Sequence, residues 1–209
     1  MSDSTRRFAF LTDLHWGYEN RGGHRKPLHD PRAWECTLKF LQDFTPQDLF
    51  FGGDILDCGA VSHHNEHKPL RTEGFRIQQD ADECRKAVIE PLEAVSKTQT
   101  YIIGNHEDWL SDVLDRDPAL EGLIDIKSML GLEKWKVVAQ GGHHKLGKLY
   151  FIHGDQIAGG VNAAKNAVEA YMQNVRLGHF HTYQAATKTS AVDAKLGKTG
   201  IVVPCLCTK

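Results

Sequence analysis

Side chains that commonly bind metal ions follow several short apolar runs of the sequence. They occur in five blocks, D-x-H, G-D-x-x-D, G-N-H-E, H-G-D and G-H-x-H. The residues of interest are Asp13, His15, Asp54, Asp57, Asn105, His106, His153, His179 and His181. Carboxylate, imidazole and amide donors suit hard or borderline divalent ions such as Mn, Fe and Zn. Because these blocks contain no thiolate, we expect an open catalytic metal site and not a structural zinc site, which relies mostly on Cys.

Strand and helix patterns alternate in the first half of the chain, and these elements must position the blocks. Apolar runs predict strands at 8–12, 48–54 and 100–104, and apolar residues at helical spacing predict helices at 31–44 and 69–97. Each of the three strands ends at one of the blocks. The alternation predicts a layered α/β fold with parallel strands, in which the loops at the carboxyl ends of the strands form the usual ligand site.

The second half of the chain is richer in strand patterns joined by glycine-containing turns. The predicted elements are helices at 109–116, 119–131 and 161–174, and strands within WKVVAQ, KLGKLYFIHGD, VRLGHFHTYQAATKT and GKTGIVVP. The first two of these strands are predicted to form a strand-turn-strand unit. Gly53, Gly104 and Gly178 directly precede ligand candidates, where a sharp turn or a close approach needs a residue without Cβ. No repeat or linker interrupts the pattern, so we expect residues 1–209 to form a single domain.

The composition is that of a globular protein, with 209 residues of which 41% are apolar and 25% charged. The net charge of -2 argues against bulk electrostatic capture of nucleic acid or a membrane, so any nucleic-acid contact must be local. The polar N-terminus and the lack of an 18-residue apolar run predict a cytoplasmic protein without a membrane partner. The cysteines are odd in number and form no CxxC pair, so we expect reduced thiols at Cys36, Cys58, Cys84, Cys205 and Cys207.

The last apolar run, GIVVP, has the pattern of a core strand. Little sequence follows it, so we expect an uncovered sheet edge near this end. A partner, such as a second copy in a homo-oligomer, or a further segment of chain could cover that edge.

The five blocks, in this order, resemble those of the calcineurin-like metallophosphoesterase superfamily across residues 13–181. Each block alone is a weak signal, but all five occur in order and each follows a strand-like run. The resemblance implies a four-layer αββα sandwich of two mixed β-sheets flanked by helices. It also implies a centre for two divalent ions at the carboxyl ends of the strands, with Mn favoured and Fe, Zn, Ni, Co or Mg as alternatives.

The resemblance also implies a role for each residue of the blocks. The first ion would be held by Asp13, His15, Asp54 and His181, and the second by Asp54, Asn105, His153 and His179. Asp54 would therefore bridge the two ions, and a hydroxide shared by them would attack the phosphorus directly. His106 would stabilise the transition state or donate a proton to the leaving group, and Asp57 would orient His106.

Two polar loops are candidates for substrate contact. His63, His64 and His67 lie in a stretch after the second block and could reach over the metals, or they could belong to a solvated loop. Arg21 and Arg25 lie in a basic loop with nearby aromatic residues, which could bind a phosphodiester backbone or a stacked base, or could be a solvated loop. Packing or turn roles are expected for Trp34, Trp109, Trp135, His143 and His144.

The second block bears on the type of phosphate ester. Phosphoprotein phosphatases follow its second Asp with Arg-Gly, whose guanidinium grips the phosphate, whereas this chain has Asp57-Cys58-Gly59. We therefore favour a phosphodiester or nucleic-acid-type substrate. A phosphomonoesterase acting on nucleotides or phosphoproteins is the alternative. A scaffold with little catalysis that binds a protein partner is a third hypothesis, against which the intact His106 and ligand set count.

Overall fold

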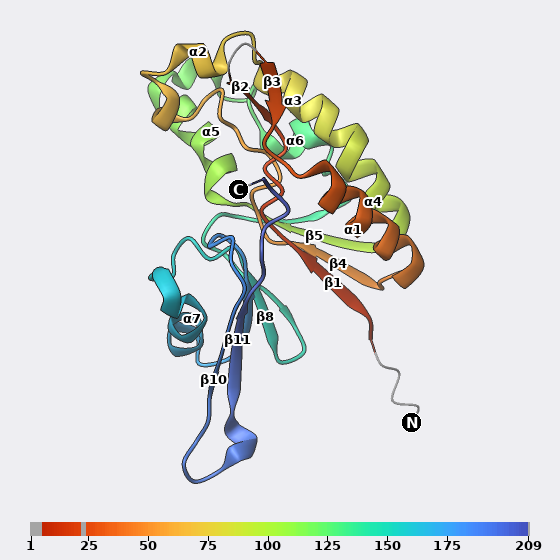
Figure 1. Cartoon of the computed structure of the whole chain (residues 1–209), viewed down its shortest axis with the longest axis vertical. Helices are drawn as coiled ribbons and strands as arrows, with labels where there is room; N and C mark the ends of the chain where they lie inside the picture. The colour runs from red at the N-terminus through yellow and green to blue at the C-terminus, as the bar shows by residue number, and fades with distance from the viewer. Residues whose placement is uncertain (1–5, 22–23, 209) are drawn as a thin grey trace.

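The computed structural model describes residues 6–21 and 24–208 and contains two main β-sheets (Figure 1). The first sheet has the strand order β1-β4-β5-β6 and is parallel throughout. Its strands are β1 (Phe8–Leu11), β4 (Asp48–Phe51), β5 (Thr98–Ile102) and β6 (Lys136–Val138). The three strands predicted in the first half of the chain are confirmed to within a few residues, and all three point their carboxyl ends toward the same edge.

The second sheet is mixed, with the strand order β10-β11-β9-β8-β7. Its three inner strands run parallel to one another, and both outer strands pair antiparallel. The strands are β7 (His144–Leu146), β8 (Leu149–Ile152), β9 (Asn174–Leu177), β10 (Gln184–Lys188) and β11 (Lys198–Val202). The mixture of strand directions implied by the resemblance is therefore confined to this sheet.

Helices cover the outer face of each sheet, as Figure 1 shows. Most of the helices lie over the first sheet, and α7 (Ala163–Tyr171) packs on β10, β11 and β9 of the second. The helices over the first sheet include α1 (Pro31–Phe44), α3 (Ile77–Cys84), α4 (Glu90–Val95), α5 (Asn105–Arg116) and α6 (Ile126–Leu130). The layers run helix, sheet, sheet, helix, which confirms the predicted four-layer sandwich.

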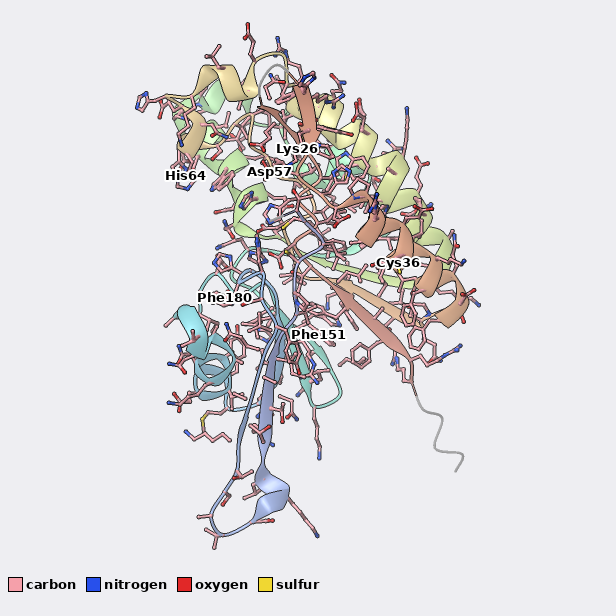
Figure 2. The ribbon with its side chains drawn as sticks, viewed as in Figure 1. Lys26, Cys36, Asp57, His64, Phe151 and Phe180 are labelled. Carbon is pink, nitrogen blue, oxygen red and sulfur yellow. The ribbon has the colours of Figure 1, made fainter. Side chains whose placement is uncertain are left out.

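Aromatic side chains fill the space between the two sheets. Phe50 of β4 stacks on Phe151 of β8 with ring centroids 4.2 Å apart, and Figure 2 labels Phe151 in this layer. Leu49 and Phe51, the neighbours of Phe50 in β4, belong instead to the core beneath the helices. This alternation follows from the two-residue period of a strand, and it explains why DLFF is apolar without a break when both faces of the sheet are buried.

The helix predicted at 69–97 is interrupted once and distorted once. It divides into α2 (Pro69–Thr72) and a helical stretch from Ile77 to Val95, with Gly74 between them at a φ of +80°. Within the longer stretch, residues 85–89 form a π-helical turn. Pro91 has no N–H to offer the Ala87 carbonyl, and the indole Nε1 of Trp34 donates to that carbonyl at 3.1 Å instead. The predicted apolar face of this stretch is buried.

Three elements differ from the sequence prediction, the first of them because a short apolar run does not specify its partner strand. WKVVAQ was expected to pair with the next strand, but β6 joins the first sheet beside β5, and the hairpin is formed by β7 and β8. Helix α6 is also shorter than the predicted 119–131, since a 3-10 turn (Pro118–Leu120) and Gly122, at a φ of +82°, come before it. Helix α5 begins at Asn105, four residues earlier than expected, directly after β5.

A small hairpin replaces the loop expected after the first block. Its strands are β2 (Tyr18–Arg21) and β3 (His24–Pro27), which pair antiparallel as a separate two-stranded sheet. Their side chains are mostly polar, so the apolar periodicity that identifies a strand was missing.

The chain returns to the first sheet after β11, through a segment of residues 203–208 that we call the C-terminal strap (Figure 1). Leu206 N–H donates to the Asp13 carbonyl at 3.0 Å, and Thr208 N–H donates to the Leu28 carbonyl at 2.7 Å. The run GIVVP does not form a sheet edge as expected, because β11 lies between β10 and β9. Among the described residues, no helix has both the length and the apolar character required to cross a membrane.

Candidate metal centre

The ligand candidates converge at the carboxyl ends of strands from both sheets. They follow β1, β4, β5, β8 and β9, and they are Asp13, His15, Asp54, Asn105, His153, His179 and His181. Five of them have a left-handed backbone, with φ values between 52° and 67°: Asp13, His15, Asp54, His179 and His181. Such conformations are uncommon in residues other than Gly and cost free energy. The fold therefore concentrates backbone strain at this point, which is typical of a functional site.

The first ligand group joins two imidazoles and two carboxylates. His15 Nε2 and His181 Nε2 lie 3.1 Å apart. Asp13 Oδ1 is 3.5 Å from His181 Nε2, and Asp54 Oδ2 is 3.8 Å from His15 Nε2. The four residues thus direct nitrogen and oxygen donors toward one small volume, as a divalent ion requires.

The second ligand group lies on the other side of Asp54. Asn105 Oδ1 is 2.9 Å from His153 Nε2 and 3.0 Å from His179 Nδ1. Asp54 Oδ2 is 3.4 Å from His153 Nε2, so one carboxylate oxygen faces both groups. Ligand atoms of Asp54, His153 and His179 all lie within 4.8 Å of one another, as a shared ion needs.

Burial disfavours the charged forms of Asp54 and His179. Burial, together with the neighbouring carboxylates of Glu107 and Asp13, raises the pKa of Asp54 well above its ordinary value. Burial also lowers the pKa of His179, with the nearby His153 acting in the same direction, and this favours the neutral imidazole that a metal requires. The donor set therefore fits two divalent ions, whose charge would stabilise the ionised carboxylates.

The outer nitrogens of the imidazole ligands are held by hydrogen-bond partners. His153 Nδ1 lies 2.7 Å from the Gly52 carbonyl, which accepts its proton and leaves Nε2 free to bind a metal. His15 Nδ1 is 3.3 Å from the Asp57 carboxylate. His181 Nδ1 is 3.7 Å from the Cys207 thiol of the C-terminal strap. The ring orientations of His153, His15 and His181 are therefore fixed by partners on the nitrogen that faces away from the ligand groups.

His106 stands beside the first ligand group at the start of α5. Its Nδ1 lies 2.7 Å from the backbone carbonyl of Asp57, whereas the Asp57 carboxylate is 3.7 Å away and closer to His15. Asp57 therefore contacts His106 mainly through its main chain, not through the side chain expected to orient it. Burial, and next the proximity of His15, lower the pKa of His106 to about 4, so the ring is neutral at pH 7.

A family model for calcineurin-like phosphoesterases matches residues 6–190 of the chain. The chain belongs to the calcineurin-like phosphoesterase family. A solved structure of the nuclease MPE from Pseudomonas putida is similar to this chain at 15% sequence identity and a TM-score of 0.48, covering 98% of this chain and 76% of that one. No curated protein matches the sequence. Membership of this family makes the chain a hydrolase of phosphate esters that depends on two metal ions.

Glu107 is a residue of the phosphoesterase centre to which the sequence analysis gave no role. Its buried carboxylate accepts hydrogen bonds from the backbone N–H groups of Asp54 at 3.0 Å, Leu56 at 2.9 Å and Gly104 at 3.0 Å. It thereby joins the loop after β4 to the start of α5, and so joins Asp54 to Asn105. Its position three residues after Gly104, where a Glu can cap a helix, was the available signal.

Cys207 is the second residue that the sequence analysis missed. No thiol was expected near the ligands, but Cys207 can be grouped with His15 and His181 as a candidate metal-binding set. The strap brings it there, since an isolated β-bridge pairs Cys207 with His29. The cysteines are free in the structure, in agreement with the expected reduced thiols.

All three glycines that precede ligands are required by close approach. A Cβ on Gly53, whose φ is +94°, would collide with the His153 ring and with the backbone of Gly104. A Cβ on Gly104 would collide with the Asp54 carboxylate, and a Cβ on Gly178 would collide with the side chains of Thr12 and Asp13. The ligand residues and their neighbours therefore leave no room for a side chain at these positions.

The candidate substrate residues fall into two regions. His63 and His64 form part of a 3-10 turn, η1 (His63–Asn65), and their rings contact Trp109 of α5. His67 follows as an exposed residue. Arg25 lies across the hairpin, with its guanidinium 3.6 Å from the ring centroid of Tyr18 and 3.2 Å from the Glu83 carboxylate. The side chain of Arg21 lies outside the described part of the structure.

The residues expected to pack do so, and Trp109 is partly buried against the core beneath the helices. Trp34 and Trp135 are buried, His143 contacts Tyr150, and His144 contacts Phe50. Trp109 is only half-buried and lies against His106, with ring centroids 4.0 Å apart.

Proposed function

We propose that the chain is a metal-dependent phosphodiesterase that acts on a nucleic-acid-type substrate. The observation that carries this proposal is the position of Asp54 Oδ2, 3.8 Å from His15 Nε2 and 3.4 Å from His153 Nε2. One carboxylate oxygen shared by two donor sets suits a pair of divalent cations, which repel each other unless an anionic group lies between them.

The proposed ligands follow from this arrangement. The first ion would be held by Asp13, His15, Asp54 and His181, and the second by Asp54, Asn105, His153 and His179. Bound at these positions, the ions supply an activated water and offset the negative charge of the phosphate. The protein supplies the fixed donors, and Glu107 holds the backbone of the bridging Asp54 in place.

His106 is the proposed proton donor to the leaving group. Its Nδ1 is occupied by the Asp57 carbonyl, so Nε2 remains for the substrate. The ring is neutral at pH 7 because its pKa is lowered to about 4, and the negative charge of a bound phosphate would favour its protonated form. We propose that Asp57 positions His15 through its carboxylate and His106 through its carbonyl.

The residue after Asp57 supports a diester over a phosphoprotein substrate. Cys58 occupies the position of the phosphate-gripping Arg, and its side chain is buried in the core beneath the helices. This part of the site therefore offers no guanidinium to a phosphate dianion. A diester carries one charge fewer than a monoester dianion and depends less on such a group.

A comparison of a chromogenic diester with the matching monoester tests the proposal. Bis(p-nitrophenyl) phosphate and p-nitrophenyl phosphate are assayed with Mn²⁺, with other divalent ions, and with EDTA. We expect metal-dependent turnover with a higher kcat/KM for the diester. In a second assay we expect the protein to cleave single- or double-stranded nucleic acid. A preference for the monoester would overturn the substrate proposal. No metal-dependent turnover of either compound would favour a scaffold.

Several expectations stay predictions at this point. They are the preference for Mn, the cytoplasmic location, a homo-oligomer, the single domain over residues 1–209, and substrate contacts by Arg21, Arg25 and His67. Metal analysis of the purified protein and its mass in solution test the first and third directly.

A further inference from the structure

A row of rings leads outward from the first ligand group to the surface. In spatial order its members are His181, His15, His106, Trp109, His64 and His63. Successive ring centroids are between 3.9 and 5.6 Å apart, so the row is continuous. It passes through His106, the proposed proton donor, and therefore extends on the side of the leaving group.

Trp109 is the central ring of the outer half of this row. It follows His106 by three residues on α5, which places both side chains on one face of the helix. The indole lies tilted at 35° to the imidazole, with centroids 4.0 Å apart. The other tryptophans, Trp16, Trp34 and Trp135, are buried, whereas Trp109 keeps part of its surface accessible beside the metal centre.

Ring contacts and hydrogen bonds hold His63 and His64, the outer end of the row, against the rest of the protein. The rings of His63 and His64 meet Trp109 edge-on, at 77° and 75°. Ser62 Oγ accepts a hydrogen bond from His64 N–H at 3.2 Å, and Asn65 Nδ2 donates to the Gly59 carbonyl at 3.0 Å, so the turn is tied to the loop that carries Asp57. Figure 2 shows His64 nearer the edge of the molecule than Asp57.

His63 and His64 keep exposed rings although they lie beside this indole. Exposed planar rings that flank a reaction centre offer stacking surfaces, and every nucleobase has a π-face that can use them. A sugar or an alkyl chain gains much less from such a surface, because it has no flat aromatic face. The row therefore favours a leaving group that carries a planar base.

We propose that Trp109, His64 and His63 form a stacking subsite for the nucleobase of the leaving nucleoside. This inference rests on the proposed phosphodiesterase function and adds the chemical class of the leaving group. The base stacks on the outer rings while the scissile phosphate reaches the ligand groups, and His106 lies between the two.

Two phosphodiesters whose leaving groups depart through the same sugar hydroxyl test the subsite. One carries a base on the leaving nucleoside, and the other has an abasic sugar at that position. We expect the wild-type protein to have a kcat/KM roughly 10-fold or more higher for the base-bearing compound. Trp109→Leu should abolish most of this ratio, and Trp109→Phe should retain part of it because an aromatic face remains. Phe40→Leu, which removes an exposed ring on α1 outside the row, serves as the matched control and should leave the ratio unchanged.

The ratio of kcat/KM values for the two compounds shows whether Trp109 binds the base or only positions His106. If Trp109 only positions His106, Trp109→Leu lowers kcat/KM for both compounds by the same factor, and the subsite is overturned. An unchanged activity on both compounds overturns it as well.

A binding measurement keeps the subsite distinct from the catalytic proposal. Tryptophan fluorescence of the metal-free protein should be quenched saturably by a nucleoside monophosphate, and this quenching should be lost in Trp109→Leu. Turnover of diesters without a base preference and without quenching overturns the subsite alone. Quenching without turnover of any phosphodiester overturns the proposed function and leaves the subsite standing. A single-stranded oligonucleotide that quenches at lower concentration than the monophosphate identifies a nucleic acid as the source of the base.

Discussion

The two ligand groups differ in what holds the outer nitrogen of their imidazoles. In the second group, the fully buried ring of His153 is held by the main-chain carbonyl of Gly52 at 2.7 Å. In the first group, His181 keeps 34% of its side chain exposed and faces the thiol of Cys207 at 3.7 Å. The second group therefore contains a ring held by the main chain directly after β4, whereas one ring of the first group, His181, depends on a side chain of a returning segment.

This difference indicates how the two metal positions should behave. A ring locked by a buried main-chain carbonyl is pre-organised, whereas a ring held by one side chain near the surface depends on that side chain. We expect a chelator to remove the ion of the first position before that of the second. The predictions below test this contrast, beginning with a change that affects both groups.

Asp54→Asn should have the largest effect, because it removes the carboxylate shared by both groups. We expect the content of both ions to fall together and the turnover of a diester to drop below detection. Elemental analysis of the purified variant is the measurement. Near-normal metal content would contradict the bridging position of Asp54.

His106→Ala should lower kcat by roughly 10² to 10⁴ while both positions keep their ions, since a positioned proton donor contributes that much. Elemental analysis and steady-state kinetics on the same preparation provide the test. A parallel loss of metal would show that His106 supports the first ligand group and would refute its role as a proton donor.

Cys207→Ala should separate the two groups. Removing the partner of His181 Nδ1 should weaken binding at the first position by about 10- to 100-fold and leave the second unchanged. Cys207→Ser should restore most of the affinity, because a hydroxyl also accepts the hydrogen bond. Competition with a coloured chelator measures both affinities, and Cys36→Ala, which removes an exposed thiol of α1, is the control. An equal loss at both positions would eliminate the proposed contrast.

The smallest effect concerns the stability of the metal-free protein. The folded state raises the pKa of Asp54, so the wild-type protein loses stability as the pH rises above about 4, where the unfolded chain releases this proton. Asp54→Asn avoids this loss and should unfold at a temperature higher by roughly 2–4 °C for each kcal/mol involved. Thermal unfolding in EDTA between pH 4 and pH 8 should show that the difference in unfolding temperature between the variant and the wild-type protein increases with pH. Excess Mn²⁺ should reverse the order of the two proteins.

The sequence contained enough local information to predict the strands and helices that carry the ligands. The bounds of α1 were predicted to the residue from Pro31 and the helical spacing of the apolar residues, and the structure adds a cap by Asp30 on its first turn. The strand ends carried the metal-binding blocks in an order that the family model also matches. The geometry brings all the predicted ligands into the two groups, although their roles await the experiments above.

Features that depend on tertiary contacts could not be predicted. The polar hairpin of β2 and β3 lacks apolar alternation, and β6 has the same local pattern whether it joins the first or the second sheet. Cys207 approaches His181 only because residues 203–208 cross from one sheet to the other. Trp109 packs against the core as expected, but nothing in the sequence showed that its ring would also lie against His106.

The C-terminal strap has a consequence for the order in which the protein matures on the ribosome. Residues 203–208 are synthesised after β11, yet they deliver the thiol that orients His181. The ligands of the second metal position have all been synthesised by His179, whereas the first position is completed only when the strap docks. During synthesis the first position would therefore be completed later than the second.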